Sequence, residues 1–320
     1  MQFTCLPESY APLGAPICYT VATARTDLEV RITDAAQRVV YGVKRFADIT
    51  EATFDIAPCL RRALQFSPAA GSTAVLNGAE RLPEVVVRAI DRTTGASVAA
   101  PLRRFVPSAG AVGRPALLTA MPRTRLIAPG ECDELTLVTE TPMSVNLKIE
   151  YGPHVVLERY ALPTEGLWRF RLHTADFPQA DRITVDAGEC GTVVYSLTAP
   201  VEGSVRLAWR SRAGSLEHYT FPVEVSAGLE AKKVHACGPD GWVSRTASEW
   251  RRKLRSALER REVLEALAEL VCSPEVWRFD RETYTPVEVL TERATVHNYG
   301  TLSSLDLVIR PKLNPLQPWN

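Results

Sequence analysis

The chain has 320 residues, of which 46% are hydrophobic and 23% charged, the balance of an ordinary globular protein with room for two or three domains. Lysine plus arginine and aspartate plus glutamate each number 37, so the formal net charge is zero. No overall field favours nucleic acid or an anionic membrane, and proteins that bind either through net charge are excluded.

The first sixteen residues, MQFTCLPESYAPLGAP, contain neither a basic stretch nor an apolar one. No later run approaches the roughly 18 apolar residues of a membrane-spanning helix, so we expect neither a signal peptide nor a transmembrane segment. The seven cysteines are dispersed without a CxxC pair, a distribution typical of a reducing compartment, where cysteine serves as a small buried apolar residue.

Residues 1–107 are predicted to form a β-sandwich domain. Apolar residues at 28, 30 and 32 alternate with polar ones, and a polar turn leads into an apolar run at 39–43. A change to helical spacing between Phe54 and Leu64 predicts one short helix. Runs at 85–90 and 98–105 enclose the turn DRTTG and predict a hairpin.

The segment PSAGAVGRPA at 107–116 is rich in proline, glycine and small residues, so it predicts a linker and the first domain boundary. Residues 108–200 are predicted to form a second β-sandwich, because short apolar runs alternate with turns such as PTEG and DAGECG. These runs lie at 135–138, 145–149, 155–160, 167–172, 183–185 and 193–197. Both sandwiches are expected to be immunoglobulin- or fibronectin-like.

Residues 201–320 are predicted to form a C-terminal α+β module. Runs at 205–209 and 216–225 flank the turn SRAGS and predict a hairpin, and runs at 276–279, 286–290 and 305–309 predict further strands. The ending PKLNPLQPWN holds three prolines and Trp319. We expect an extended tail that becomes ordered only where a surface receives it.

One long helix is predicted over 246–272. Its apolar residues recur at three- and four-residue steps: Trp250, Leu254, Ala257, Leu258, Val263, Leu264, Leu267, Leu270 and Val271. Thr246 or Ser248 is expected to cap its start, and Pro274 to end it. The leucine stripe should pack on the sheet of the module. The fold class is therefore mainly β, with two tandem β-sandwich domains followed by an α+β module.

Basic residues gather in this predicted helix, at 251, 252, 253, 255, 260 and 261. Glutamates interleave them, with Glu249 and Lys253 at a stabilising four-residue spacing. A solvated, salt-bridged face explains this pattern better than a nucleic-acid interface.

The motifs of common catalytic sites do not occur in the sequence. GxSxG, GxxxxGK[ST] and GxGxxG are missing, and the five histidines lack the HExxH and HxxxH spacings. We therefore expect no catalytic residue, cofactor or metal. A hydrolase with two dispersed carboxylates stays open, with Glu217, Glu224 and Asp186 among the candidates, although acidic residues that alternate on strands usually form a solvated face.

Aromatic side chains on the predicted strands support an alternative, a carbohydrate-binding or adhesin-like surface module. They can stack on sugar rings if several share an exposed face, although an alternating aromatic on a strand is more often core. The residues concerned are Trp168, Phe170, Tyr195, Trp209, Tyr219 and Trp277. Candidates for ligand stacking or protein interaction are Trp168, Trp209, Trp277 and Trp319.

The C-terminal module has a recognisable order of parts: a strand ending at Trp209, a polar glycine turn, the run SLEHYTF, a helix closing in LAELVCSPEVW and the strand TPVEVL. Near the N-terminus lie GAPICYTV and ATFDIAPCLRRAL. This combination resembles a group of virion proteins encoded by phages and prophages of gut anaerobes. Arg210 and Ser211 stand where that group has Leu and Asn, and Ser215 follows Gly214 where the group has paired glycines.

The resemblance implies a non-enzymatic structural subunit of a tail or related particle, acting through protein–protein contacts. Its partners would be other structural proteins of the assembly, or further copies of the chain in a homo-oligomer. It implies a location in the virion, or in the bacterial cytoplasm before assembly. Tandem β-sandwiches suit such a role, because their edges and loops offer repeated contact surfaces.

Overall fold

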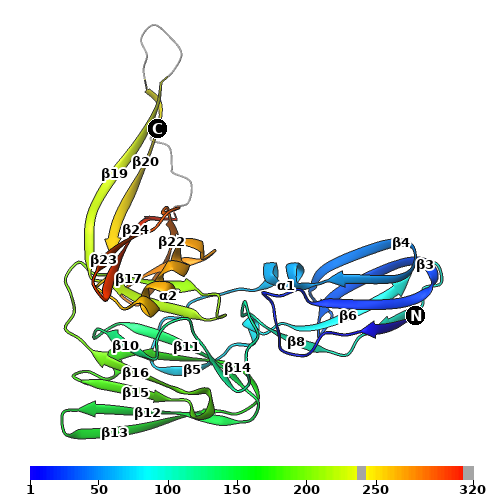
Figure 1. Ribbon diagram of the computed structural model, residues 1–320, viewed down its shortest axis with the longest axis horizontal. Coiled ribbons are helices and arrows are strands. Elements are labelled where there is room, and N and C mark those ends of the chain that lie inside the picture. The colour runs from blue at the N-terminus through cyan, green and yellow to red at the C-terminus, as the bar shows by residue number, and fades with distance from the viewer. Residues whose placement is uncertain (236–242, 313–320) are drawn as a thin grey trace.

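The computed structural model describes residues 1–235 and 243–312. Within these ranges the chain has 24 strands and two α-helices, so the predicted mainly β class is confirmed. Figure 1 shows an N-terminal part at one end, a layered β part, and a C-terminal module from which a two-stranded hairpin projects. Neither helix in the described part of the chain is long and apolar enough to cross a bilayer.

The N-terminal part is a sheet that curls round one core. Its strands are β1 (Gln2–Cys5), β2 (Ala11–Pro12), β3 (Cys18–Asp34), β4 (Val40–Asp55), β6 (Glu84–Asp91), β7 (Ser97–Ala99) and β8 (Arg103–Val106). β4 follows one edge of β3, whereas β1 and β6 pair with different halves of the other edge. Register shifts between Ala22 and Leu28 bend the long strand. The predicted hairpins at β3–β4 and β6–β7 are confirmed.

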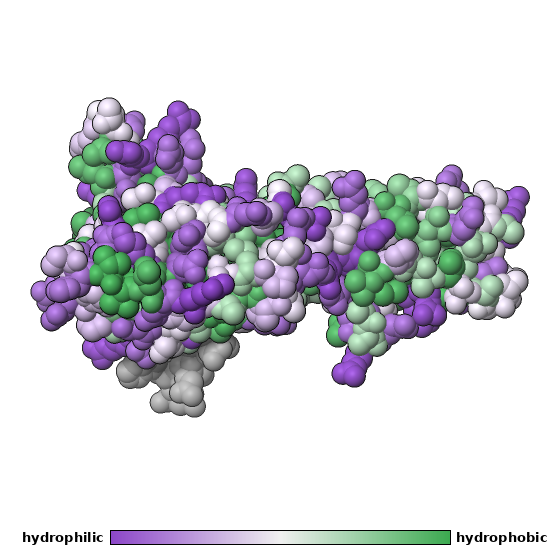
Figure 2. Space-filling view, turned by 90° about the horizontal axis from the view of Figure 1, so that it is seen from below, coloured by the Kyte–Doolittle hydropathy of each residue, from purple (hydrophilic) through white to green (hydrophobic). Residues whose placement is uncertain are grey.

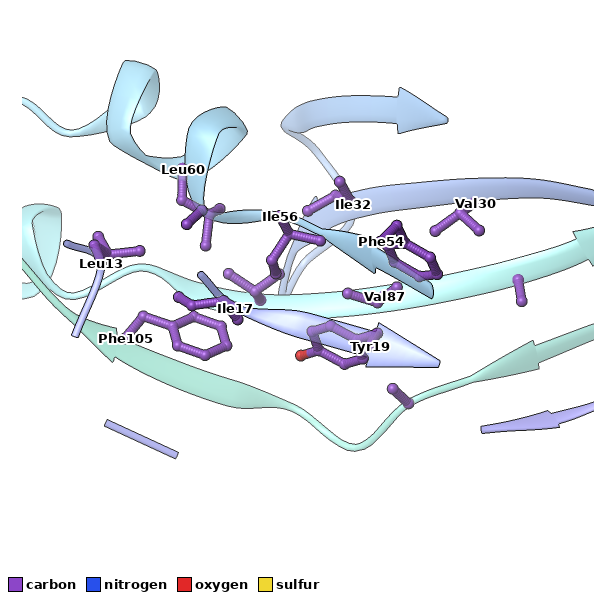
Figure 3. Close-up of a cluster of buried hydrophobic side chains, with 14 of the residues drawn as sticks. Leu13, Ile17, Tyr19, Val30, Ile32, Phe54, Ile56, Leu60, Val87 and Phe105 are labelled. Atoms are coloured by element: carbon purple, nitrogen blue, oxygen red, sulfur yellow. The ribbon is translucent and has the colours of Figure 1, made fainter. Parts of the chain in front are cut away.

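The core of this part is aromatic and aliphatic (Figure 3). The rings of Tyr19 and Phe54 stack, with centroids 6.0 Å apart. Ile56 and Leu60 lie at one end of this core with the short helix α1 (Ala57–Ala63), which the sequence spacing had predicted. Pro58 sits in the first turn of α1, where its missing N–H removes no helical hydrogen bond.

The layered part contains two sheets. One holds β10 (Thr124–Ile127), β16 (Thr192–Leu197), β15 (Arg182–Asp186), β12 (Met143–Tyr151) and β13 (His154–Leu162) in that order. The other holds β5 (Ala74–Asn77), β14 (Gly166–His173), β11 (Cys132–Thr139) and β9 (Ala116–Leu118). Inward residues of both, such as Leu147 and Phe170, form one core, as in a sandwich. Short 3₁₀ turns lie at η1 (Ala79–Arg81), η2 (Thr174–Asp176) and η3 (Gly188–Cys190).

The chain enters the sandwich before the N-terminal sheet is complete. β5 lies within the range 1–107, yet it pairs with β14, with Trp168 opposite Asn77. The segment at 107–109, within the predicted linker, packs against the C-terminal module, where Ala109 N donates to Arg212 O at 2.7 Å. The three parts are therefore joined by contacts as well as by the chain.

The C-terminal module is an eight-stranded sheet with one helix on it. The sheet runs β18 (Leu216–Phe221), β17 (Val205–Arg210), β21 (Val276–Asp280), β22 (Thr283–Val289), β24 (Leu302–Pro311), β20 (Val243–Arg255) and β19 (Val223–His235), with β23 (Thr295–Tyr299) paired to β24. The helix α2 (Arg261–Cys272) packs its leucine stripe, Leu264, Leu267 and Leu270, into the core under this sheet, as predicted.

The first half of the predicted helix over 246–272 is wrong. Residues to Arg255 form β20, and α2 begins at Arg261 after Arg260, so neither Thr246 nor Ser248 caps a helix. Apolar residues four apart, such as Trp250 and Leu254, fit a helical period and also a strand, where every second residue shares a face. Pairing with β19 along the length of β20 decides for the strand. The basic residues 251–255 accordingly form ion pairs across strands, not along a helix face.

Candidate functional site: a projecting hairpin and a buried charge network

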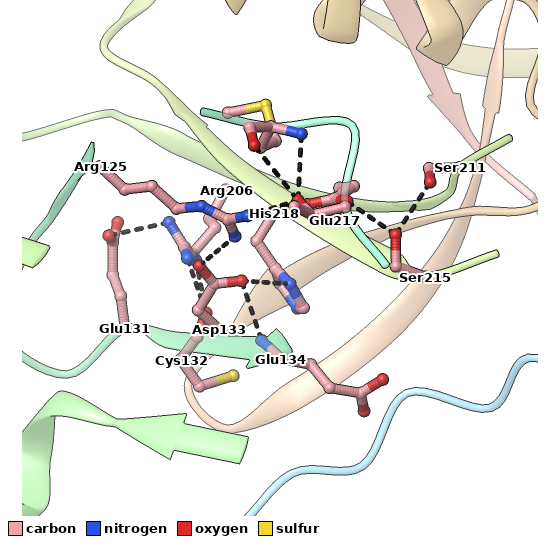
Figure 4. A network of polar contacts seen from close by, with 12 residues as sticks. Arg125, Glu131, Cys132, Asp133, Glu134, Arg206, Ser211, Ser215, Glu217 and His218 are labelled. Carbon is pink, nitrogen blue, oxygen red and sulfur yellow. Dashed lines mark hydrogen bonds and ion pairs between the residues drawn. The ribbon is translucent and has the colours of Figure 1, made fainter. Parts of the chain in front are cut away.

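A network of charged side chains lies where the sandwich meets the C-terminal module (Figure 4). Its centre is Asp133 on β11, which is 2% exposed. Arg125 Nη1 donates to Asp133 Oδ2 at 2.9 Å, and His218 Nδ1 on β18 lies 3.1 Å from Asp133 Oδ1. Because β11 belongs to the sandwich and β18 to the module, this cluster joins the two parts.

The network extends from His218 towards β22. His218 Nε2 lies 2.9 Å from Tyr284 Oη, which in turn lies 2.8 Å from the thiol of Cys132. Burial raises the pKa of Cys132 to about 11, so its thiol stays protonated at neutral pH. This row therefore holds Tyr284 in place and supplies no thiolate nucleophile.

Two further groups bind the module to the sandwich. Glu217 Oε1 accepts hydrogen bonds from Ala120 N at 2.8 Å and from Ser215 Oγ at 2.7 Å. Arg206 on β17 donates through Nη2 to the carbonyl of Cys132 at 2.6 Å, and its Nη1 lies 3.0 Å from Glu131 Oε2. Glu217 and Arg206 are 1% and 5% exposed, so these bonds form away from water.

The surroundings of Asp133 and Arg125 favour the charged form of each. Burial alone would raise the pKa of Asp133, but Arg125, His218 and Arg206 hold that pKa well below its usual range. Burial alone would likewise lower the pKa of Arg125, yet Asp133 and Glu217 raise it. Paired buried charges of this kind are costly to separate. The network therefore holds the two parts together. It is called the clamp below and consists of Asp133, Arg125, His218, Arg206 and Glu217.

The expected site residues are not brought together. Glu217 belongs to the clamp, Glu224 lies 3.3 Å from Arg252 Nη1 on the hairpin, and Asp186 accepts the N–H of Gly188 in a turn of the sandwich. Each carboxylate is thus engaged in a different place. Among the described residues, no group of three or more His, Cys, Asp or Glu side chains is placed to hold a metal ion.

The tryptophan candidates have different surroundings. Trp209 is 0% exposed and belongs to the core of the module, so the expected stacking role is wrong for it. Trp168 is half-buried against the sandwich core, and its indole N–H donates to Thr164 O at 3.0 Å. Trp277 is half-buried in a surface pocket beside Tyr284, while Trp319 lies outside the described residues. With Phe170 and Tyr195 also at 0% exposure, the six aromatics do not form one exposed face.

The projecting hairpin is formed by β19 and β20. β20 pairs with β24 only over Arg252–Arg255, so residues 243–251 have β19 as their single neighbouring strand in the described chain. At about 3.3 Å per residue this free part is roughly 26 Å long. Figure 1 shows it standing out from the module. A two-stranded ribbon is marginal in water by itself, so its stability depends on the pairs on its two faces.

One face of the hairpin is charged. Glu230 and Glu249 are directly opposite each other, and Arg251 bridges them at 2.5 Å and 2.6 Å. Arg310 on β24 continues the row through Glu249 and Glu288. This ladder of alternating signs gives the face its cross-strand stability.

The other face carries an exposed apolar pair. Leu229 and Trp250 are directly opposite each other and both are 55% exposed. By strand alternation Trp250 shares its face with Leu254, which is fully buried under α2. Arg252 lies between them on this face and pairs with Glu224 at 3.3 Å, so the exposed pair is separated from the core by one ion pair.

Another exposed apolar group lies on the outer strand of the sandwich. Val155, Val156 and Leu157 on β13 are 50%, 45% and 74% exposed. Figure 2, viewed from below, shows a hydrophobic patch over the part of the molecule where β12 and β13 lie. β13 is an edge strand paired only with β12 in the described sheet, so this patch supplies a comparison surface for the hairpin.

Sequence reasoning missed both the clamp and the hairpin. The run CDELTLVT of β11 is buried throughout, so its two acidic residues lie inside the protein. Acidic residues within an otherwise apolar strand are the signal that was present in the sequence. The hairpin was not predicted because Trp250 and Leu254 are four residues apart, a spacing that fits a helix as well as a strand.

No protein-family model matches the chain, and no curated protein matches it. Among solved structures, the chain is similar to the crystal structure of the N-terminal four immunoglobulin domains of Dscam1 isoform 9.44, with zinc. The identity is 10%, the TM-score is 0.18, and the match covers 78% of this chain and 68% of that chain. A score this low carries no argument, so the fold assignment rests on the sheets themselves.

Proposed function

We propose that the protein is a non-enzymatic structural subunit of an assembly, and that the β19–β20 hairpin is the element that contacts its neighbour. The observation that carries this proposal is the opposed pair Leu229 and Trp250, exposed on an arm that projects from the module. An apolar pair at the centre of a charged, projecting ribbon has the composition of an interface core with a polar rim.

The clamp supports this function mechanically. A projecting arm transmits force to its base, and here the base is joined to the sandwich by Asp133, Arg125 and His218. Rigid coupling keeps the arm in one orientation, which lowers the entropy lost when it binds. The partner is another structural protein of the same assembly, and the assembly is a phage or prophage tail or a related particle, as the resemblance of the C-terminal motifs implies.

The direct test is co-expression with the proteins encoded beside this chain, followed by size-exclusion chromatography with light scattering. The wild-type chain should form a defined complex with one of them. Trp250→Ser and Leu229→Asp should each weaken that complex at least tenfold, because they remove the apolar pair while leaving the charged face intact.

The matched control is Leu157→Asp, at a more exposed apolar position on β13. This variant should bind as the wild type does. A chain that stays a strict monomer with every neighbouring gene product would overturn the proposal, and so would a complex weakened equally by the control variant.

A further inference from the structure

The strand β13 forms one edge of the five-stranded sheet of the sandwich, with β12 as its neighbour in the described chain. The ladder between them runs from Tyr151 opposite His154 to Met143 opposite Leu162 without a register shift. An unpaired edge is a template for another strand, so proteins usually interrupt it with a bulge or a proline. Between His154 and Leu162 there is neither.

The odd-numbered residues of β13 direct their backbone groups to the open edge. Asp181 N donates to Glu150 O at 2.8 Å, so the backbone of Glu150 is turned towards the β15 side and away from β13. Val155 lies opposite Glu150, and opposite residues of an antiparallel pair either bond each other or both point away. Val155, Leu157 and Arg159 therefore offer unpaired N–H and C=O groups to a further strand.

The side chains of these residues lie on the outer face of the sheet. The residues of β12 opposite Val156 and Glu158 are Ile149 and Leu147, which are fully buried, so the odd-numbered residues of β13 point away from the core. Leu157 is 74% exposed. Edge strands are commonly protected by a charged side chain at their centre, and this one has an exposed leucine there.

We propose that two copies of the chain associate through β13, which pairs antiparallel with β13 of the second copy across a two-fold axis at Leu157. The two sandwich sheets then form one continuous sheet. In this register Leu157 lies opposite Leu157 of the second copy, and Val155 lies opposite Arg159. Because all these residues direct their backbone groups outwards, each opposite pair exchanges both of its hydrogen bonds.

Charge complementarity favours this register and a second copy as the occupant. A two-fold axis at Glu158 or at Arg159 would place like charges directly opposite each other, which is destabilising. With the axis at Leu157, Arg159 of the second copy lies two strands from Glu150 on the same face, roughly 10 Å away at about 4.8 Å per strand. Their long side chains can meet across Val155. The edge is thus complementary to itself.

This inference does not rest on the function proposed for the hairpin. Figure 1 shows β13 on the far side of the molecule from β19 and β20, so both surfaces can be occupied at once. The dimer should therefore persist in Trp250→Ser. Conversely, Leu157→Asp should separate the two copies while each chain still binds its neighbour through the hairpin.

Sedimentation equilibrium of the chain alone tests the proposal. The wild type should be dimeric at micromolar concentrations, and Leu157→Asp should raise the dimer Kd at least tenfold, because two carboxylates then meet on the axis. Val155→Pro should do the same, since it removes an N–H that only the second copy uses. The control is Leu126→Asp on β10, the opposite edge of the same sheet, where Leu126 is 66% exposed. It should dimerise as the wild type does.

Cysteine cross-linking tests the register, in chains whose native cysteines other than Cys132 and Cys190 are replaced by serine. Leu157→Cys should form a disulfide between copies under oxidation with copper phenanthroline. Opposite Cα atoms of a hydrogen-bonded pair are about 5.5 Å apart, which a disulfide spans. Val155→Cys should not cross-link, because it lies roughly 13 Å along the ladder from its own copy.

Three results would overturn the proposal. A wild-type chain that stays monomeric at the highest concentration measured would show that the edge does not self-associate. A dimer unaffected by Leu157→Asp, in a variant whose circular dichroism matches the wild type, would place the interface elsewhere. Cross-linking through Val155→Cys in place of Leu157→Cys would exclude the two-fold axis at Leu157.

Discussion

Asp133 on β11 and His218 on β18 lie 3.1 Å apart, carboxylate oxygen to ring nitrogen, although they belong to different sheets. Both side chains are buried, and Arg125 shares the carboxylate. This contact fixes the C-terminal module to the sandwich at a point where a simple apolar interface would allow sliding. Its removal should therefore be felt in both parts.

Asp133→Asn should lower the free energy of unfolding by about 3 kcal/mol, because the buried guanidinium of Arg125 loses the closer of its two charged partners and keeps only Glu217, at 3.4 Å. Urea unfolding followed by circular dichroism measures the change. Glu189→Gln, at an exposed position of the same sandwich, is the control and should stay within about 0.5 kcal/mol of the wild type. Equal stabilities of the two variants would contradict the role given to the clamp.

The clamp also predicts the response to acid. Since the pKa of Asp133 is lower in the folded protein than in the unfolded chain, its contribution is complete above about pH 4, near the unfolded value of about 3.9. That contribution should be lost as the pH falls below 4 towards the folded pKa. Urea midpoints measured from pH 7 down to pH 2.5 should fall less steeply for Asp133→Asn than for the wild type. Parallel curves would argue against this assignment.

Leu267→Asp should unfold the C-terminal module, at a cost of about 4 kcal/mol or more, because it places an unpaired charge in the core under the sheet. Leu258→Asp provides a sharp control. The sequence pattern puts both residues on one helical stripe, but Leu258 precedes α2 and is 53% exposed. Thermal melts should show a large loss for the first variant and almost none for the second.

Gly214→Ala should destabilise the protein by about 1–3 kcal/mol. Gly214 has φ +87°, and a Cβ there would meet the backbone of Pro107 and Ser108 at 2.9 Å. Gly300→Ala is the matched variant, since Gly300 has φ +67° but open space around it. Differential scanning calorimetry should show a larger loss at 214, and a larger loss at 300 would rule out the close approach of residues 107–108.

The alternation of apolar and polar residues predicted most strands correctly, because this pattern is contained in the sequence of each strand. The pattern at 28–32, for example, lies within β3, and the run at 145–149 lies within β12. Spacing failed where two periods coincide, as for Trp250 and Leu254. It also failed for the clamp, because Asp133 and His218 meet through long-range packing that neither strand specifies alone.

The exposed pair Leu229 and Trp250 could not be predicted from the sequence for a related reason. Trp250 was assigned to a buried helical stripe, yet it is exposed because β24 ends its pairing with β20 at Arg252. Exposure on a projecting hairpin depends on where a third strand stops. Among the aromatic candidates, Trp277 lies in a pocket beside Tyr284.

The pairing of β5 with β14 has a consequence for biosynthesis. Residues 74–77 leave the ribosome long before their partner strand, which begins at Gly166. At about 5–20 residues per second, β5 waits on the order of 5–20 s for β14 to be made. During that interval the N-terminal sheet can form around its own core, while β5 remains an unpaired template for neighbouring nascent chains. Spacing between ribosomes on the message thus becomes a determinant of yield.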